Sequence, residues 1–149
     1  MTVAERLTEL GITLPEPVRP VANYVRHVQT GNLLFISGTG PTKAAPTGKV
    51  GTDLTVEQGY DVAREVGLQI IATVQDALGD LDRVARVVKV LGMVNCAPDF
   101  RDQPKVINGC SDLMVEVFGD AGRHTRSAVG FVALPDQIAV EIEATFEVR

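Results

Sequence analysis

The chain of 149 residues is poor in the residue types that most often mark metal sites, disulfide frameworks and polyanion binding. It has two cysteines, Cys96 and Cys110, without the short spacing of a zinc site, and we expect both to be reduced thiols. The net charge is −5, and no cluster of Lys and Arg indicates binding to nucleic acid. No apolar run approaches the roughly 20 residues that span a bilayer. The charged N-terminus does not resemble a signal peptide, so we expect a cytoplasmic protein with no membrane contact.

The composition that remains is that of an ordinary globular protein. Hydrophobic residues make up 45% of the chain and charged residues 22%, which suits one domain over residues 1–149 with a substantial core. Thr2 and Glu5 have the spacing of a capping box and predict a short helix that ends near Gly11. This helix belongs to an N-terminal extension of residues 1–19, which continues as a proline-rich, extended segment.

The rest of the chain alternates strand-like and helix-like segments. Thr55 and Gln58 form a second capping box, and the helix that follows is expected to end at Gly79. The predicted elements are strands at Tyr24–Thr30 and Asn32–Gly38, a helix from Thr55, a strand at Arg83–Asn95, a helix at Gln103–Phe118, and strands at Arg126–Ala133 and Ile138–Val148. This order predicts an α+β fold: one mixed β-sheet with two helices packed on the same face.

The strands carry more apolar residues than one covered face requires. Both sides of the segment Leu33–Ile36 are apolar, and two helices cannot cover both faces of a sheet, so we expect the other face to meet another subunit. In the last strand Val140, Ile142, Ala144, Phe146 and Val148 alternate with Glu141, Glu143, Thr145 and Glu147. The acidic side is either a solvated face or an interface at which a Glu has a partner or a function.

Several motifs carry little chemistry by themselves. The sequence Gly38-Thr39-Gly40-Pro41 lacks the ending of a phosphate-binding loop, and Ser37 lacks a hydrolase elbow. His27 and His124 would form a nuclease pair only if the fold brought them together. Arg126 opens a strand before the small residues Ala128 and Gly130. It either faces water at a strand end or clamps an anion with its planar guanidinium.

Longer segments resemble a known family. The stretch RSAVGFVALPDQIAVEIEATFEV, which begins at Arg126, resembles the C-terminal signature of the Rid (YjgF-like) family. Three further segments resemble the family in the same order: PVANYVRHVQTGNLLFISG, TVEQGYDVAREVGLQIIATVQDALGDLDRVARVVKVLGMVN and QPKVINGCSDLMVEVFG. The resemblance covers roughly Pro20 to Val148. The long N-terminus and the segment GRHTRSAVG resemble a subgroup of the family that is often labelled as endoribonucleases.

The resemblance implies a chorismate-mutase-like subunit in a homotrimer, with the sheets facing the central axis and pockets between adjacent subunits. It implies hydrolytic deamination of 2-enamino and 2-imino acids, such as 2-aminoacrylate and 2-iminopropionate, to 2-keto acids and ammonia. No metal or cofactor is required. The alternatives are a non-catalytic trimer that binds small carboxylate metabolites, an endoribonuclease, and a hydrolase of another C–N or acyl bond.

The resemblance also assigns roles to residues. Arg126 would bind the substrate carboxylate together with the backbone N–H of Ala128, and Glu141 would orient the attacking water and transfer protons. Glu141 is expected to stay ionised near Arg126. Tyr24, Ser37 and Asn108 would line the pocket. The sequence departs from the family at three positions: Ala128 replaces a Cys, Thr39 a common Gln and Gly130 a frequent Glu.

Overall fold

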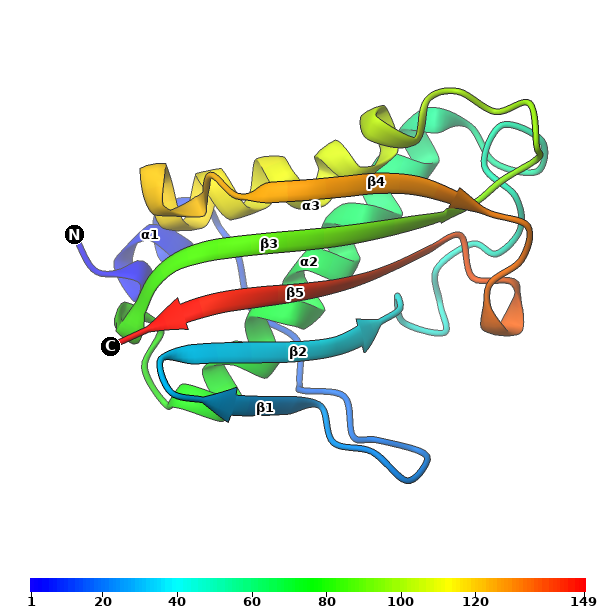
Figure 1. The fold of residues 1–149 in the computed structure, drawn as a ribbon. Helices are drawn as coiled ribbons and strands as arrows, with labels where there is room; N and C mark the ends of the chain where they lie inside the picture. The colour runs from blue at the N-terminus through cyan, green and yellow to red at the C-terminus, as the bar shows by residue number, and fades with distance from the viewer.

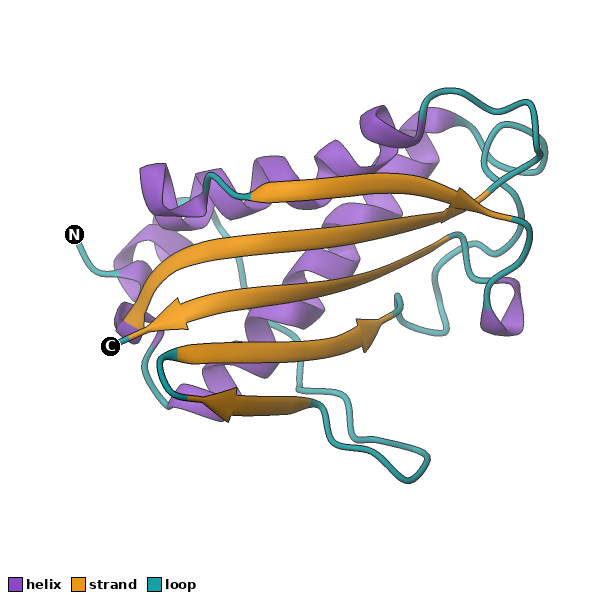
Figure 2. Ribbon diagram, in the orientation of Figure 1, coloured by secondary structure: helices purple, strands orange, loops and turns teal.

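A computed structural model describes all 149 residues as one five-stranded sheet with helices on one of its faces (Figures 1 and 2). The strands are β1 (His27–Thr30), β2 (Leu33–Thr39), β3 (Val84–Asn95), β4 (Thr125–Phe131) and β5 (Val140–Val148). Their order across the sheet is β1-β2-β5-β3-β4, and only the β3–β4 pair is parallel. The helices are α1 (Val3–Glu9), α2 (Val56–Leu78) and α3 (Gln103–Phe118). The predicted fold class is confirmed, including the placement of both long helices behind one face.

Local signals fix the helix ends. The Thr55 hydroxyl accepts a hydrogen bond from the backbone N–H of Gln58 at the start of α2, and the Gln58 side chain completes the capping box. The helix ends where Gly79 adopts a left-handed conformation with φ 77°. Thr2 and Glu5 make the same reciprocal contacts at the start of α1. These predictions from sequence are confirmed.

The strand boundaries differ from the predictions at several ends. Strand β1 begins at His27, so Tyr24 lies in the preceding loop. The pairing of β2 with β5 shifts between Ile36 and Thr39, and the β1–β2 ladder stops at the pair His27–Ile36. Beyond this pair the loop still contacts β2, because the backbone N–H of Ser37 donates to the carbonyl oxygen of Arg26 over 2.9 Å. Strand β5 begins at Val140, after a short 3₁₀ turn at Pro135–Gln137.

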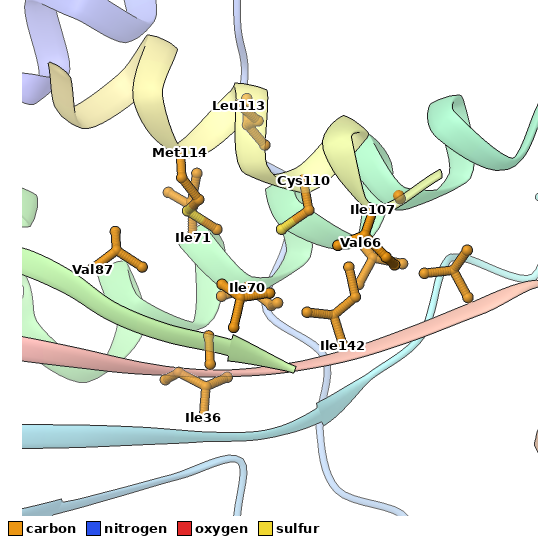
Figure 3. Close-up of a cluster of buried hydrophobic side chains, with 14 of the residues drawn as sticks. Ile36, Val66, Ile70, Ile71, Val87, Ile107, Cys110, Leu113, Met114 and Ile142 are labelled. Carbon is orange, nitrogen blue, oxygen red and sulfur yellow. The ribbon is translucent and has the colours of Figure 1, made fainter. Parts of the chain in front are cut away.

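The core lies between the sheet and the helix pair (Figure 3). Helices α2 and α3 approach closely at Gly109, where a Cβ would overlap with the carbonyl oxygen of Tyr60. The sheet contributes the predicted apolar side of β5, and all of its members are buried: Val140, Ile142, Ala144, Phe146 and Val148. Cys96 and Cys110 are free thiols, as predicted, and both are buried.

The face of the sheet opposite the helices, called the open face below, is not covered by any part of the chain. It carries apolar side chains, among them Phe35, which is 43% exposed. A shallow hollow of about 400 Å³ on this face is lined in part by Val28, Phe35, Leu91 and Glu143. A sheet face in water would be polar, so this surface has the composition of an interface. No helix is long and apolar enough to cross a membrane.

Candidate functional site

The six residues predicted to form the site lie in two separate clusters within the chain. The first, called the edge cluster, lies between α3 and the edge strand β4. It contains Arg126, Ala128 and Asn108, joined by Ser111 and His124. The second, called the sheet-end cluster, lies where β2 and β5 meet the loop before β1. It contains Tyr24, Ser37 and Glu141, joined by Arg26 and Gly38.

Arg126 is held at the edge of the sheet by a hydrogen bond to α3. It pairs with buried Val90 on β3 and therefore points to the helix side of the sheet. Its Nη1 donates to Ser111 Oγ over 3.1 Å. The ion pairs of the structure do not include Arg126, so a half-buried, permanently charged guanidinium is left without an acidic partner. Such a group is suited to binding an anion.

His124 completes a chain of hydrogen bonds behind Arg126. Its Nδ1 lies 2.7 Å from the carbonyl oxygen of Gly122, and its Nε2 lies 2.9 Å from Ser111 Oγ. Because a carbonyl oxygen can only accept, the neutral ring carries its proton on Nδ1, and Ser111 donates to Nε2. Burial lowers the pKa of His124, and the charge of Arg126 lowers it further, whereas the bond to Gly122 acts in the opposite direction. The ring is therefore neutral near pH 7.

The other residues of the edge cluster have supporting positions. Asn108 lies on α3 one turn before Ser111 and is half-buried. Ala128 follows Arg126 on the same side of β4 and packs against the core. Cys110 lies near Arg126, but its thiol is fully buried and its pKa is raised to about 12 by desolvation. Cys110 is thus a core residue and not a nucleophile.

Glu141 occupies the centre of the sheet-end cluster. It pairs with Met93 and lies on the open face, half-buried. Its carboxylate rests on the backbone of Gly38, where a Cβ would lie only 2.6 Å from Glu141 Oε2. Burial raises the pKa of Glu141 and the neighbouring Glu143 raises it further, while the charge of Arg26 lowers it. A carboxyl with a raised pKa is suited to proton transfer.

Arg26 frames this cluster from the loop before β1. Its Nη1 donates to the carbonyl oxygen of Gly38 over 3.2 Å and to Tyr24 Oη over 3.4 Å, and its Nη2 donates to Thr39 Oγ1 over 2.8 Å. The Ser37 hydroxyl donates to the carbonyl oxygen of Val25 over 2.6 Å, which ties β2 to the same loop. Tyr24 is partly exposed at the rim.

Arg126 and Glu141, which the resemblance places in one pocket, do not meet within one chain. Arg126 faces the helices and Glu141 faces away from them, so Arg126 cannot keep Glu141 ionised within one chain. The nearby cation is Arg26, and the net effect on the pKa of Glu141 is a rise. The alternation within each strand was readable from sequence, but the two strands present their functional residues on opposite faces.

Sequence reasoning missed two residues of these clusters. Arg26 was not singled out, because an Arg beside a hairpin has no distinguishing pattern, and Ser111 is one of several small polar residues on α3. His27 and His124 lie at opposite edges of the sheet, near β1 and β4, so one chain does not form a histidine pair. No group of three or more His, Cys, Asp or Glu side chains is arranged to hold a metal ion.

The fold is that of a small α+β domain in which Arg126 lies at one edge of the sheet and Glu141 lies on the open face. Residues 4–139 match the family described as "YjgF/chorismate mutase-like, putative endoribonuclease". Protein TCP17 of Trypanosoma cruzi is 47% identical over 99% of this chain and 94% of its own length.

Two solved structures share the fold over almost the whole chain. A protein of unknown function from Agrobacterium tumefaciens is 43% identical with a TM-score of 0.91, covering 99% of this chain and 92% of its own. A protein from Shewanella oneidensis, described as a "putative endoribonuclease", is 31% identical with a TM-score of 0.94, and the match covers 99% of this chain and all of that one. The chain belongs to the YjgF/chorismate mutase-like family.

Proposed function

We propose that this protein hydrolyses small 2-imino and 2-enamino acids to 2-keto acids and ammonia, in pockets formed between the subunits of a homotrimer. The observation that carries the proposal is the separation of the two clusters. Arg126 has no acidic partner and lies at a free sheet edge, while Glu141 lies on an open, partly apolar face. A neighbouring subunit that covers the open face with its β4 edge would bring the two residues into one pocket.

In this pocket Arg126 of one subunit binds the substrate carboxylate. The guanidinium offers several N–H donors in one plane, and Ser111 already fixes one of them. The backbone N–H of Ala128 adds a second contact. Strand β4 pairs only with β3, so its outer side is free to meet a ligand or a neighbour. With the carboxylate fixed, the imine carbon takes a defined position.

Glu141 of the adjacent subunit serves as the acid/base. Glu141 takes a proton from a water molecule as the oxygen attacks the carbon of the N-protonated imine, which gives a neutral carbinolamine. It gives this proton to the nitrogen and takes the hydroxyl proton as the C–N bond breaks, so that ammonia leaves and the carbinol oxygen becomes the keto oxygen. The proton left on Glu141 passes to ammonia or solvent. One water is consumed, and one keto acid and one ammonia are formed. Tyr24, Ser37 and Asn108 line the pocket in this proposal, and the raised pKa of Glu141 suits both proton transfers.

A coupled assay tests the proposal. A threonine or serine dehydratase generates the 2-enamino acid, and keto-acid formation is followed with the wild type, Arg126→Ala and Glu141→Gln. Acceleration by the wild type that is lost in both folded variants supports the two roles. No acceleration by the wild-type trimer contradicts the proposal for these substrates.

Two other functions have distinct signatures in the same preparation. A carboxylate-binding protein would bind small keto acids through Arg126 but show no turnover. An endoribonuclease, as the family's description suggests, would cleave RNA in step with the protein through purification. The net charge of −5 and the distance between the two histidines along the sheet favour a small anionic substrate over RNA.

A further inference from the structure

A hollow of about 530 Å³ adjoins the sheet-end cluster and shares Tyr24, Arg26 and Gly38 with it. Its volume is in the range of pockets that hold small molecules. Besides these residues, its lining includes Thr39, Lys43, Thr47, Asp136 and Ile138. Glu141 lies against the same Gly38, so the hollow begins beside the carboxyl to which we assign the proton transfers.

The charged groups of this hollow are unbalanced. Arg26 and Lys43 line it together with one acidic residue, Asp136. None of the ion pairs in the structure involves Arg26 or Lys43. A cationic hollow lined by threonine and tyrosine hydroxyls suits an anion.

Arg26 also has unused hydrogen-bonding capacity. A guanidinium has five N–H donors, and Arg26 uses three of them, all on neutral oxygens of Tyr24, Gly38 and Thr39. Its Nε is buried without any acceptor. Glu141 partly offsets the charge of Arg26, since Arg26 lowers the pKa of that carboxyl, but no carboxylate accepts a hydrogen bond from the guanidinium. The bonds to Gly38 and Thr39 hold the guanidinium beside the hollow and reduce the freedom it would lose on binding an anion.

We propose that this hollow is a second anion subsite and that the preferred substrates are 2-imino dicarboxylic acids. The inference rests on the proposed function. The 2-carboxylate would bind Arg126 of the adjacent subunit, the imine carbon would lie at Glu141, and the side-chain carboxylate would extend past Gly38 toward Arg26 and Lys43. The reaction is unchanged: the imine and one water give the keto dicarboxylate and ammonia, with no oxidant or reductant.

The test compares two imines that differ by one carboxylate. An amino-acid oxidase generates the imine of alanine and a D-aspartate oxidase generates the imine of aspartate. The fraction of imine that this protein hydrolyses in competition with semicarbazide gives kcat/KM for each. We expect the wild type to prefer the dicarboxylic imine by about tenfold or more, because a half-buried cation favours the ligand whose carboxylate pairs with it.

The variants Arg26→Gln and Lys43→Met test which side chains cause the preference for the dicarboxylic imine. Arg26→Gln keeps a donor for Gly38 without the charge and should reduce the ratio of the two kcat/KM values to near one. Lys43→Met changes an exposed loop residue and should reduce the ratio by a smaller factor. Lys105→Met is the matched control and should leave the ratio unchanged, since Lys105 on α3 pairs with the N-cap residue Asp102 and lies outside both clusters. Thermal melting of each variant confirms folding.

Calorimetric titration with succinate and propionate examines the subsite without turnover. Equal hydrolysis of both imines by the wild type, unchanged in ratio by Arg26→Gln, overturns the subsite and leaves the proposed function standing. Hydrolysis of neither imine contradicts the proposed function, and the titration then decides the subsite alone. Tighter binding of succinate than propionate that is lost in Arg26→Gln supports the subsite, and equal binding of the two acids overturns it.

Discussion

Replacing Gly38 with alanine should disable Glu141 without unfolding the protein. A Cβ at this position would lie 2.6 Å from Glu141 Oε2, which is 0.8 Å short of the 3.4 Å at which ordinary contacts begin. The obstacle is the far end of a side chain and not backbone, and Gly38 does not have a positive φ. The carboxylate therefore moves aside, and the cost to stability is small.

The expected loss of activity follows from this displacement. A shift of a catalytic group by about 1 Å can reduce a rate by about a hundredfold. For 0.8 Å we expect kcat on 2-iminopropionate to fall by about 10- to 100-fold. In the proposed site the carboxylate of the substrate binds Arg126 of the adjacent subunit, and the Gly38 substitution does not disturb that contact. KM should therefore change much less than kcat.

The assay is the coupled measurement of keto-acid formation, with thermal melting to confirm folding. Gly59→Ala is a matched control, because a Cβ there also crowds a neighbour, at 3.1 Å from Val50 Cγ1, but lies outside both clusters. In a Glu141→Gln background the Gly38 substitution should add little, since both changes act on one group. Wild-type kcat in a folded Gly38→Ala variant would refute the assigned role of Glu141.

Three further substitutions test other parts of the structure. Phe146→Ala should lower the free energy of unfolding, measured by urea denaturation, by about 3–5 kcal/mol. Phe146 is fully buried and packs edge-to-face on Phe118, with 6.2 Å between the ring centroids. His124→Gln should remove a loss of stability on acidification: the unfolded chain takes up a proton near its usual pKa of about 6.5, and folded His124 only at lower pH. Phe35→Glu should dissociate the proposed trimer into monomers, as measured by light scattering, because it places a charge on the apolar open face.

Each of these results has a contradicting outcome. A loss below 1 kcal/mol for Phe146→Ala would mean that the core repacks around the missing ring. Unchanged acid sensitivity in His124→Gln would place the responsible titration elsewhere. Leu10→Glu changes an exposed apolar residue outside the sheet and should leave the mass in solution unaltered. If Phe35→Glu also stayed a trimer, the open face would not be the subunit interface.

The fold was largely readable from sequence because its signals are local. Thr55, Gln58 and Gly79 fix both ends of α2 through contacts within a few residues. The alternation in β5 likewise assigns Phe146 to the core and Glu141 to the other side. Tyr24 was misplaced into a strand because its residue type favours strands, whereas the extent of β1 depends on its pairing with β2, which stops at the pair His27–Ile36.

The site was only partly readable because it depends on pairing between distant segments. Sequence alternation indicates that Arg126 and Glu141 each have a preferred side, but not whether the two sides coincide. Arg126 pairs with Val90 in the parallel ladder, and Glu141 pairs with Met93 in the antiparallel ladder. These pairings place Arg126 and Glu141 on opposite faces of the sheet. Arg26 became visible only when the fold placed its guanidinium beside Gly38 and the adjoining hollow.

The central claim is that each active site combines Arg126 of one subunit with Glu141 of another. The most direct test mixes Arg126→Ala and Glu141→Gln protein in equal amounts, unfolds and refolds the mixture, and measures imine hydrolysis. Random assembly should return about one quarter of the wild-type activity, because one site in four then unites an intact Arg126 with an intact Glu141. Activity that stays at the level of the separately refolded variants would contradict a site shared between subunits.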